Sequence, residues 1–194
     1  MDNNPFRHTI ETPNLLLLPI QHDDEAVYCH LFTSDDIMKY IAPPISTEKA
    51  TRSFQAALKM NEAYPTVRFF WAMKDKKSQS TIGIMSLLWG NSNTKERMEK
   101  VEVGMSICQS HQQAGIGTEA MTGLMTRGFN CLSVNSIFGK SSPQNLTCTR
   151  LMTKLGFIKE ECIHDDGTLW FHWLLKKQQW YQHPLYLKYA NHHQ

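Results

Sequence analysis

Three extended apolar segments follow one another in the middle of the chain, and they constrain the fold more than any other feature. Residues 67–73 and 80–88 flank the turn-forming stretch Asp75-Lys76-Lys77-Ser78, so they predict a hairpin. A polar stretch and a third extended segment, residues 101–108, come next. A largely antiparallel sheet at the centre of the fold is therefore expected.

Helical and extended patterns alternate around these strands. Before them we expect a short strand at residues 15–18 and helices at 22–33, at 34–41 and from Thr47 to just before Pro65. After them we expect a helix over 114–127 ended by Gly128, a strand at 136–140, a helix at 145–155 and a hairpin of 157–163 with 168–175. The aromatic tail from Lys176 shows no pattern. The sequence predicts one α+β domain over residues 1–194, with its core at about 12–176 and a tail at 177–194.

Composition narrows the partners and the compartment. The formal net charge of +2 gives no basic field for nucleic acid. Five scattered cysteines predict reduced thiols, and the histidines lack metal-ligand spacing, so no metal is expected. The apolar run from Leu15 to Ile20 is far shorter than the ~20 residues of a membrane span. We expect a soluble, cytoplasmic protein without a membrane partner.

The segment after the third extended stretch is the strongest candidate binding site. Gly115, Gly117 and Ala120 satisfy the loose G-x-G-x-x-G/A dinucleotide fingerprint. Six residues separate Gly115 from the strand, however, and no acidic residue follows at 137–140, so a nicotinamide-dependent oxidoreductase is excluded. Gly139-Lys140-Ser141 fails as a P-loop because Val134 replaces its first glycine. A glycine loop entering a helix N-terminus remains, which suits a pyrophosphate; the alternative is a tight turn without a ligand.

Several motifs in one order carry a resemblance to a known family. Gln112-Gln113-Ala114-Gly115-Ile116-Gly117 resembles the Q/R-x-x-G-x-G/A coenzyme A loop of the GNAT acetyltransferases. Glu102-Val103-Gly104-Met105 is similar to the E-I-G-Y strand of its ribosomal-protein N-terminal acetyltransferase (RimJ/RimL-like) branch. Further matches lie at residues 12–19, 70–83 and 145–157, so the resemblance covers about 12–176. Cys148 replaces the branch's usual serine, and Asn14 and Leu18 replace basic residues.

The resemblance implies the GNAT fold, an α/β/α sandwich with a mixed, mostly antiparallel sheet flanked by helices. It implies acetyl-CoA as cosubstrate and transfer of its acetyl group to an amine. Glu102 is then the candidate base and Cys148 the candidate acid. The implied coenzyme-binding residues are the backbone of Met105, Ser106 and Ile107, the loop Gln112, Gln113, Ala114, Gly115, Ile116, Gly117 and Thr118, and Asn145.

Each of these roles has a plainer alternative. Glu102 belongs to an acidic run typical of an exposed edge, Asn145 suits a helix cap, and Cys148 suits a packed thiol. Four aromatic residues border an acceptor cleft or belong to the core: Tyr28, Tyr40, Trp89 and Trp170. The acceptor is expected to be the N-terminal α-amine of a protein or peptide. A small amine, such as a polyamine, an antibiotic or an amino-acid-like metabolite, is the alternative, and so is a non-catalytic acyl-CoA-binding domain. A monomer and a homodimer both stay open.

Overall fold

A computed structural model describes residues 9–63, 66–89, 99–112 and 115–191. The strands are β1 (Ile10–Glu11), β2 (Leu15–Pro19), β3 (Arg68–Asp75), β4 (Thr81–Trp89), β5 (Lys100–Ile107), β6 (Ser136–Ser141), β7 (Ile158–Ile163) and β8 (Leu169–Lys176). The helices are α1 (Glu25–Thr33), α2 (Asp35–Met38), α3 (Thr47–Glu62), α5 (Ile116–Cys131), α6 (Leu146–Lys154), α7 (Lys177–Tyr181) and α8 (Pro184–Asn191). Within these ranges, no helix is long and apolar enough to cross a membrane.

The strands form one mixed sheet in the order β1-β2-β3-β4-β5-β6-β8-β7. All neighbours in it are antiparallel except β5 and β6, which are parallel. A parallel pair cannot be joined by a tight turn, and here the connection is α5. The expected mixed, mostly antiparallel sheet is confirmed.

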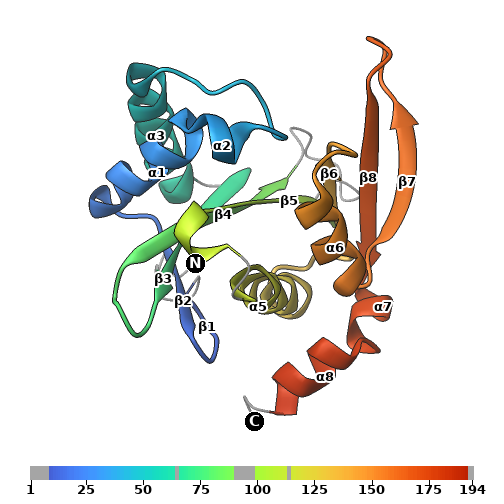
Figure 1. Ribbon diagram of the computed structural model, residues 1–194. Coiled ribbons are helices and arrows are strands. Elements are labelled where there is room, and N and C mark those ends of the chain that lie inside the picture. The colour runs from blue at the N-terminus through green and yellow to red at the C-terminus, as the bar shows by residue number, and fades with distance from the viewer. Residues whose placement is uncertain (1–8, 64–65, 90–98, 113–114, 192–194) are drawn as a thin grey trace.

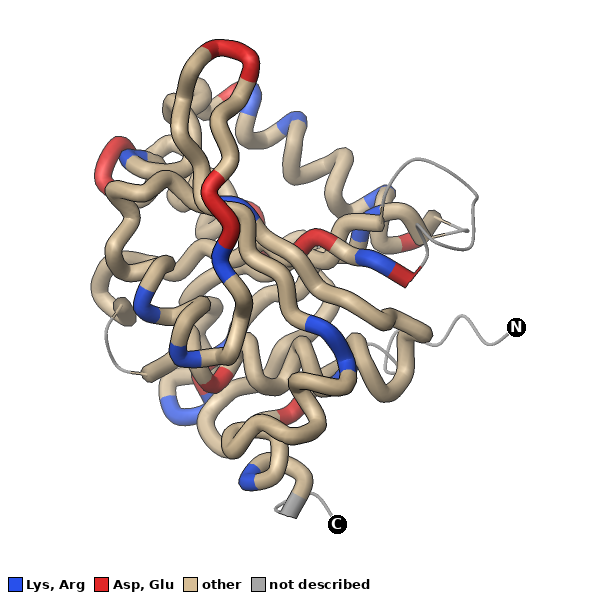
Figure 2. The backbone as a smooth tube through the Cα atoms, turned by 90° about the vertical axis from the view of Figure 1, so that its right-hand side faces the viewer, with Lys and Arg blue, Asp and Glu red and all other residues tan. Residues whose placement is uncertain are grey.

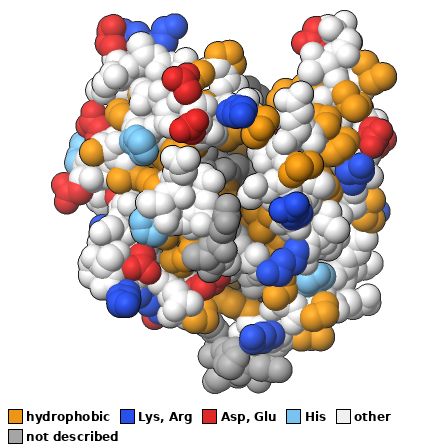
Figure 3. All heavy atoms as spheres, in the orientation of Figure 1, with side chains coloured by type: hydrophobic (Ala, Val, Ile, Leu, Met, Phe, Trp, Pro, Cys, Tyr) orange, Lys and Arg blue, Asp and Glu red, His pale blue; other side chains and the backbone are white. Residues whose placement is uncertain are grey.

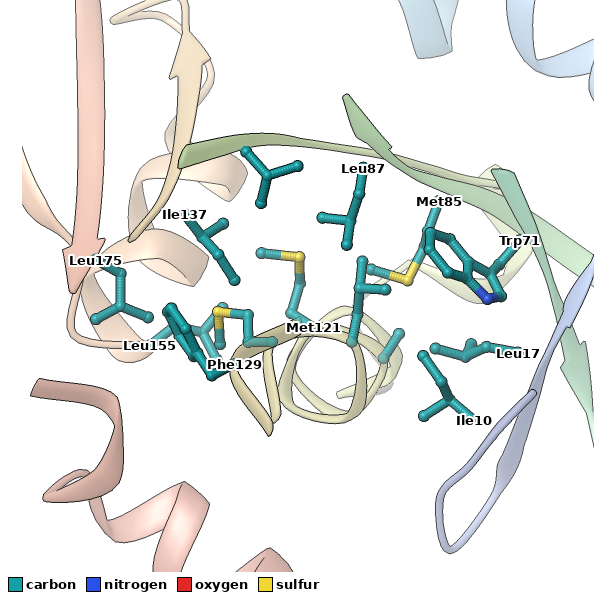
Figure 4. Close-up of a cluster of buried hydrophobic side chains, with 14 of the residues drawn as sticks. Ile10, Leu17, Trp71, Met85, Leu87, Met121, Phe129, Ile137, Leu155 and Leu175 are labelled. Atoms are coloured by element: carbon teal, nitrogen blue, oxygen red, sulfur yellow. The ribbon is translucent and has the colours of Figure 1, made fainter. Parts of the chain in front are cut away.

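Helices cover both faces of this sheet (Figure 1). On one face, α1 and α3 enclose a cluster that includes Tyr28, Phe54 and Phe70. On the other face, α5 packs under the strands, and its Met121 and Phe129 meet strand residues such as Trp71 and Leu87 (Figure 4). Because side chains alternate along a strand, each central strand contributes to both clusters. The result is the three-layer arrangement that the sequence predicts.

Two helix ends differ from expectation. α5 does not end at Gly128 but continues to Cys131. Its Gly128 lies under the sheet, where an added Cβ would make ordinary contacts with Ile137 and Leu87, so tertiary packing overrides a local stop signal. α2 is a short helix of four residues capped by Ser34, shorter than the predicted 34–41 segment.

The tail is not patternless, which corrects the sequence analysis. It forms α7 and α8, which pack beside α5. Trp180 is fully buried and its Nε1 donates to Thr126 Oγ1 at 3.2 Å, while the Tyr189 hydroxyl donates to the Glu11 carbonyl at 2.7 Å. The helical spacing was hidden because the segment breaks at Pro184 into two short helices, each too short to show a period.

We predict that the docked tail contributes substantially to stability. Trp180→Ala should lower the free energy of unfolding by about 3–5 kcal/mol, since it removes a large buried ring and leaves a cavity. Urea denaturation measures this loss. Leu187→Ala on α8, where the side chain is half exposed, is the matched control and should change stability by far less. If Trp180→Ala lowers the free energy of unfolding as little as Leu187→Ala does, the tail is not part of the cooperative core.

Candidate active site

The two parallel strands separate soon after they meet. Their pairing covers only Lys100 with Ser136, Val101 with Ile137, and Glu102 with Phe138. Beyond that point β5 continues to pair with β4 as far as Ile107, and β6 continues with β8 as far as Ser141. Residues 103–107 therefore border a gap in the sheet that no strand of the described chain fills (Figure 1).

Strand alternation places the two candidate catalytic residues on opposite faces of this gap. Val101 and Val103 pack into the cluster around α5, so Glu102 between them faces the α1–α3 side. Cys148, on α6, packs against the α5 cluster. The gap thus lies between the carboxylate of Glu102 on one face of the sheet and the thiol of Cys148 on the other.

The predicted anion loop runs into the N-terminus of α5 beside this gap. Gly115 is the N-cap of α5 and has φ 79°, a left-handed conformation that favours glycine. The first N–H groups of a helix have no partners within the helix, so those of Ile116, Gly117 and Thr118 suit an anion. Gln112 is exposed, and its Nε2 donates to the Ile107 carbonyl at 3.0 Å. Gln113 and Ala114 lie outside the described residues.

Gly117 lies in a closely packed position. A Cβ at this position would lie 3.2 Å from Met105 Cε and 3.5 Å from Leu151 Cδ2. The first turn of α5 therefore packs closely against both β5 and α6. By contrast, nothing lies within 4 Å of a Cβ built on Gly115, so its backbone faces open space. The loop is thus closely packed at Gly117 and open at Gly115, and the open side has room for the phosphate groups of a coenzyme.

The first turn of α6 holds the candidate acid. Asn145 is the N-cap, as predicted, and its Oδ1 accepts from the Cys148 N–H at 2.9 Å. Burial raises the pKa of the Cys148 thiol above its ordinary value, and a hydrogen bond with the Ser141 side chain partly opposes this shift. The thiol is therefore protonated at neutral pH. Met105, Ser106 and Ile107 lie across the gap on β5, all partly buried.

Two residues that sequence reasoning missed support this thiol. Ser141 is buried at the end of β6, and Trp173 Nε1 on β8 donates to its Oγ at 2.9 Å. The indole thus fixes the serine that hydrogen-bonds Cys148. Ser141 appeared in the sequence only as part of a failed P-loop match, and its pairing with Trp173 depends on the register of β6 with β8.

An open cavity of about 650 Å³ is lined on the sheet by Trp170 of β8, which lies on the same face of the sheet as Glu102, although Glu102 itself is not part of the lining. Figure 3 shows the hollow at the top of the molecule, between the region of α2 and the β7–β8 hairpin. Acidic residues flank it, with Asp35 and Asp36 on one side and, at the hairpin tip, the acidic turn seen in Figure 2. The lining also includes Lys39, Tyr40, Ile41, Ala42, Pro43, Pro44, Ser142, Gln144 and Trp170.

The four aromatic residues considered for an acceptor cleft divide evenly. Tyr40 and Trp170 line the cavity. Tyr28 and Trp89 are buried, Tyr28 in the α1–α3 cluster and Trp89 in the α5 cluster. For the second pair the core alternative is confirmed.

A split sheet, a glycine loop at a helix N-terminus and an adjoining cavity define a coenzyme-dependent transferase. The family model of the acetyltransferase (GNAT) domain matches residues 14–158, and the chain belongs to this family. It is an acetyl-CoA-dependent N-acetyltransferase, and the described residues contain no cluster of His, Cys, Asp or Glu arranged to hold a metal ion.

Relatives agree with this assignment. The uncharacterized N-acetyltransferase p20 of Bacillus licheniformis is 25% identical over 159 residues, covering 81% of this chain and 86% of that protein. The fold is that of spermidine N-acetyltransferase from Vibrio cholerae in complex with CoA and spermine (TM-score 0.71, 15% identity, 86% and 98% covered). It is also that of RimL, a ribosomal L7/L12 α-N-protein acetyltransferase in complex with coenzyme A (TM-score 0.72, 14% identity, 87% and 97% covered).

We predict that Gly115→Ala weakens coenzyme A binding about tenfold or more, a loss of about 1.4 kcal/mol or more, measured by isothermal titration calorimetry. The added methyl group enters the open space beside the helix N-terminus. Gly167→Ala is a matched control, because Gly167 has φ 78° and also nothing within 4 Å of its Cβ position, but it lies at the β7–β8 turn. Equal weakening by both variants, or binding of NADH as tight as that of coenzyme A, would contradict the assignment.

Proposed function

We propose that the enzyme acetylates the N-terminal α-amine of a protein or peptide by direct transfer from acetyl-CoA. The observation that carries this proposal is the open cavity on the Glu102 face, separated by the gap in the sheet from the thiol of Cys148. An amine entering from the cavity and a coenzyme entering along α5 and α6 meet at this gap. The motif order of the RimJ/RimL-like branch and the fold likeness to RimL support the same acceptor.

The chain's own groups suit the pyrophosphate and the pantetheine arm of the coenzyme. We assign the pyrophosphate to residues Gln112 to Thr118 and the pantetheine arm to the backbone of Met105, Ser106 and Ile107. Asn145 uses its Oδ1 to accept the capping hydrogen bond, so its Nδ2, which can donate, is the atom assigned to the coenzyme. When bound, acetyl-CoA supplies an activated thioester carbonyl.

The energetics of deprotonation favour an α-amine over a lysine side chain. An α-amine with pKa ~7.7–8.0 costs less than about 1.4 kcal/mol to deprotonate at neutral pH, whereas a lysine with pKa ~10.4 costs about 4–5 kcal/mol. Glu102, partly exposed at the start of β5, is a modest base that suffices for the first task. We further propose a cytoplasmic location, since all five cysteines are free and suit a reducing compartment.

A small cationic amine is the second candidate acceptor. Asp35 and Asp36 on the cavity wall would attract a second positive charge, and spermidine N-acetyltransferase shares the fold. Lys39 on the same wall opposes a second positive charge on the substrate.

A matched acceptor panel tests this choice. We expect a peptide with a free N-terminus to have a higher kcat/KM than the same peptide with a blocked N-terminus and one free lysine, and a higher value than spermidine or an aminoglycoside. Thiol release from acetyl-CoA is the measurement. If spermidine is the best acceptor and Asp35→Asn with Asp36→Asn selectively weakens its use, the small-amine candidate replaces the peptide.

The environment of Cys148 favours a proton donor over a nucleophile. Nucleophilic attack requires the thiolate, but burial raises the pKa of this thiol and keeps it protonated. A buried thiol that stays protonated at neutral pH still holds a proton that it can give to the departing coenzyme thiolate.

We predict that Cys148→Ser retains activity, whereas Cys148→Ala loses about 10²-fold in kcat, the low end for general acid catalysis. The serine keeps a proton donor of similar size, and the alanine removes it at a stability cost of only about 1 kcal/mol. Steady-state kinetics measure both variants. An acetylated Cys148 found by mass spectrometry without an acceptor, or full activity of the alanine variant, would contradict the donor role.

A further inference from the structure

Two histidines on the β7–β8 hairpin form a pair that sequence spacing did not reveal. His172 lies on β8 and His164 in the turn before it, and their Nε2 atoms are 3.3 Å apart. The His164 ring also stacks on Trp170, with centroids 5.8 Å apart. His172 is partly buried, whereas His164 is exposed. The pair therefore connects a partly buried imidazole on the sheet with one that is exposed to solvent.

The register of the sheet places His172 on the acceptor side. His172 is the cross-strand partner of Lys140 on β6, and Lys140 shares a face with Phe138, the partner of Glu102. Trp170, two residues before His172 on the same face of β8, lines the cavity. His172 thus shares with Glu102 the face on which the amine is proposed to enter.

Burial and charged groups on β5, β6 and β7 set the protonation of His172. Burial lowers the pKa of its imidazole, and the Lys140 cation and His164 lower it further. Glu160 on β7 and Glu102 on β5 raise it by smaller amounts. The net effect is a lowered pKa. His172 is therefore neutral at neutral pH, and it stays able to accept a proton at a lower pH than an ordinary histidine does.

We propose that His172 and His164 form a proton relay, in which His172 takes up the proton that Glu102 removes from the acceptor amine and His164 passes it to solvent. An alkylammonium nitrogen loses two protons on becoming an amide. As the C–N bond forms and the C–S bond breaks, Cys148 gives its proton to the sulfur of the coenzyme, and one of the two protons from the nitrogen replaces it on Cys148. The other must reach solvent, and the histidine pair supplies its route. This inference rests on the proposed transfer to an amine but not on which amine is used.

The facing Nε2 atoms suit this task. One Nε2–H can donate to the other ring's lone pair, so the pair accommodates one added proton, whereas two added protons would place two N–H donors against each other. A proton taken up by His172 is thereby shared with His164 and released at the exposed end of the hairpin.

Kinetics with the best acceptor of the panel test the relay. His172→Gln should lower kcat about 10²-fold, within the range of general base catalysis, and remove the acidic limb of the pH–rate profile. In His172→Ala, added imidazole should restore part of the lost rate. His164→Gln should act in the same direction but less, and exposed His22→Gln is the control that should behave like the unaltered enzyme.

Imidazole ¹⁵N NMR titration of the protein without ligands gives a second, independent readout. Glu102→Gln should lower the pKa of His172 further, since its carboxylate raises that pKa, and His164→Gln should raise it. An unchanged acidic limb in His172→Gln without imidazole rescue, or histidines that titrate independently, would overturn the relay. A panel on which only a small amine reacts would refute the peptide proposal while leaving the relay testable with that amine.

Discussion

The separation of β5 from β6 is the constraint on which the rest of the site depends. A strand edge exposes N–H and C=O groups that need hydrogen-bond partners, and residues 103–107 lose theirs on one side after only three pairs. The structure meets part of this need locally, since Gln112 donates to the Ile107 carbonyl. We assign the remaining edge to the amide groups of pantetheine, which would extend the sheet as a short strand does. The reactive carbonyl of acetyl-CoA would then lie where the two faces communicate.

Close packing on one side and hydrogen bonds on the other hold α5 beside this gap. Gly117 allows the first turn of α5 to approach Met105 on one side and Leu151 of α6 on the other. α5 is itself held from its far side, because the Glu119 carboxylate accepts hydrogen bonds from Thr12 and from Asn14 at the β1–β2 turn. The N-terminus that faces the coenzyme is therefore fixed by contacts on a different surface. Asn14, which replaces a basic residue of the motif that the sequence resembles, takes part in this supporting contact.

Local patterns sufficed to predict most strands, the Asn145 cap, the hairpins and the position of the glycine loop, because each depends on near neighbours in the sequence. Features set by pairing between distant segments were not predicted. Ser141 meets Trp173, and His172 lies on the face of Glu102, only through the register of β6 with β8. The docking of the tail was not predicted, because it depends on a hydrogen bond from Trp180 to Thr126 on α5, which is distant in the sequence. The role of Glu102 stays a prediction, since a strand position defines a face but not a function.

The replacement of serine by Cys148 is compatible with a working acid because the protein controls both the proton and the direction of the thiol. Burial keeps the sulfur protonated, and Ser141, itself held by Trp173, offers it a fixed hydrogen-bond partner. A thiol is intrinsically a stronger acid than an alcohol, so even with its pKa raised by burial it can serve as the proton donor to a leaving thiolate. An exposed cysteine with a lowered pKa would instead favour a nucleophile. The surroundings of Cys148 therefore argue for chemistry retained with a different donor atom, not for a binding domain that has lost its activity.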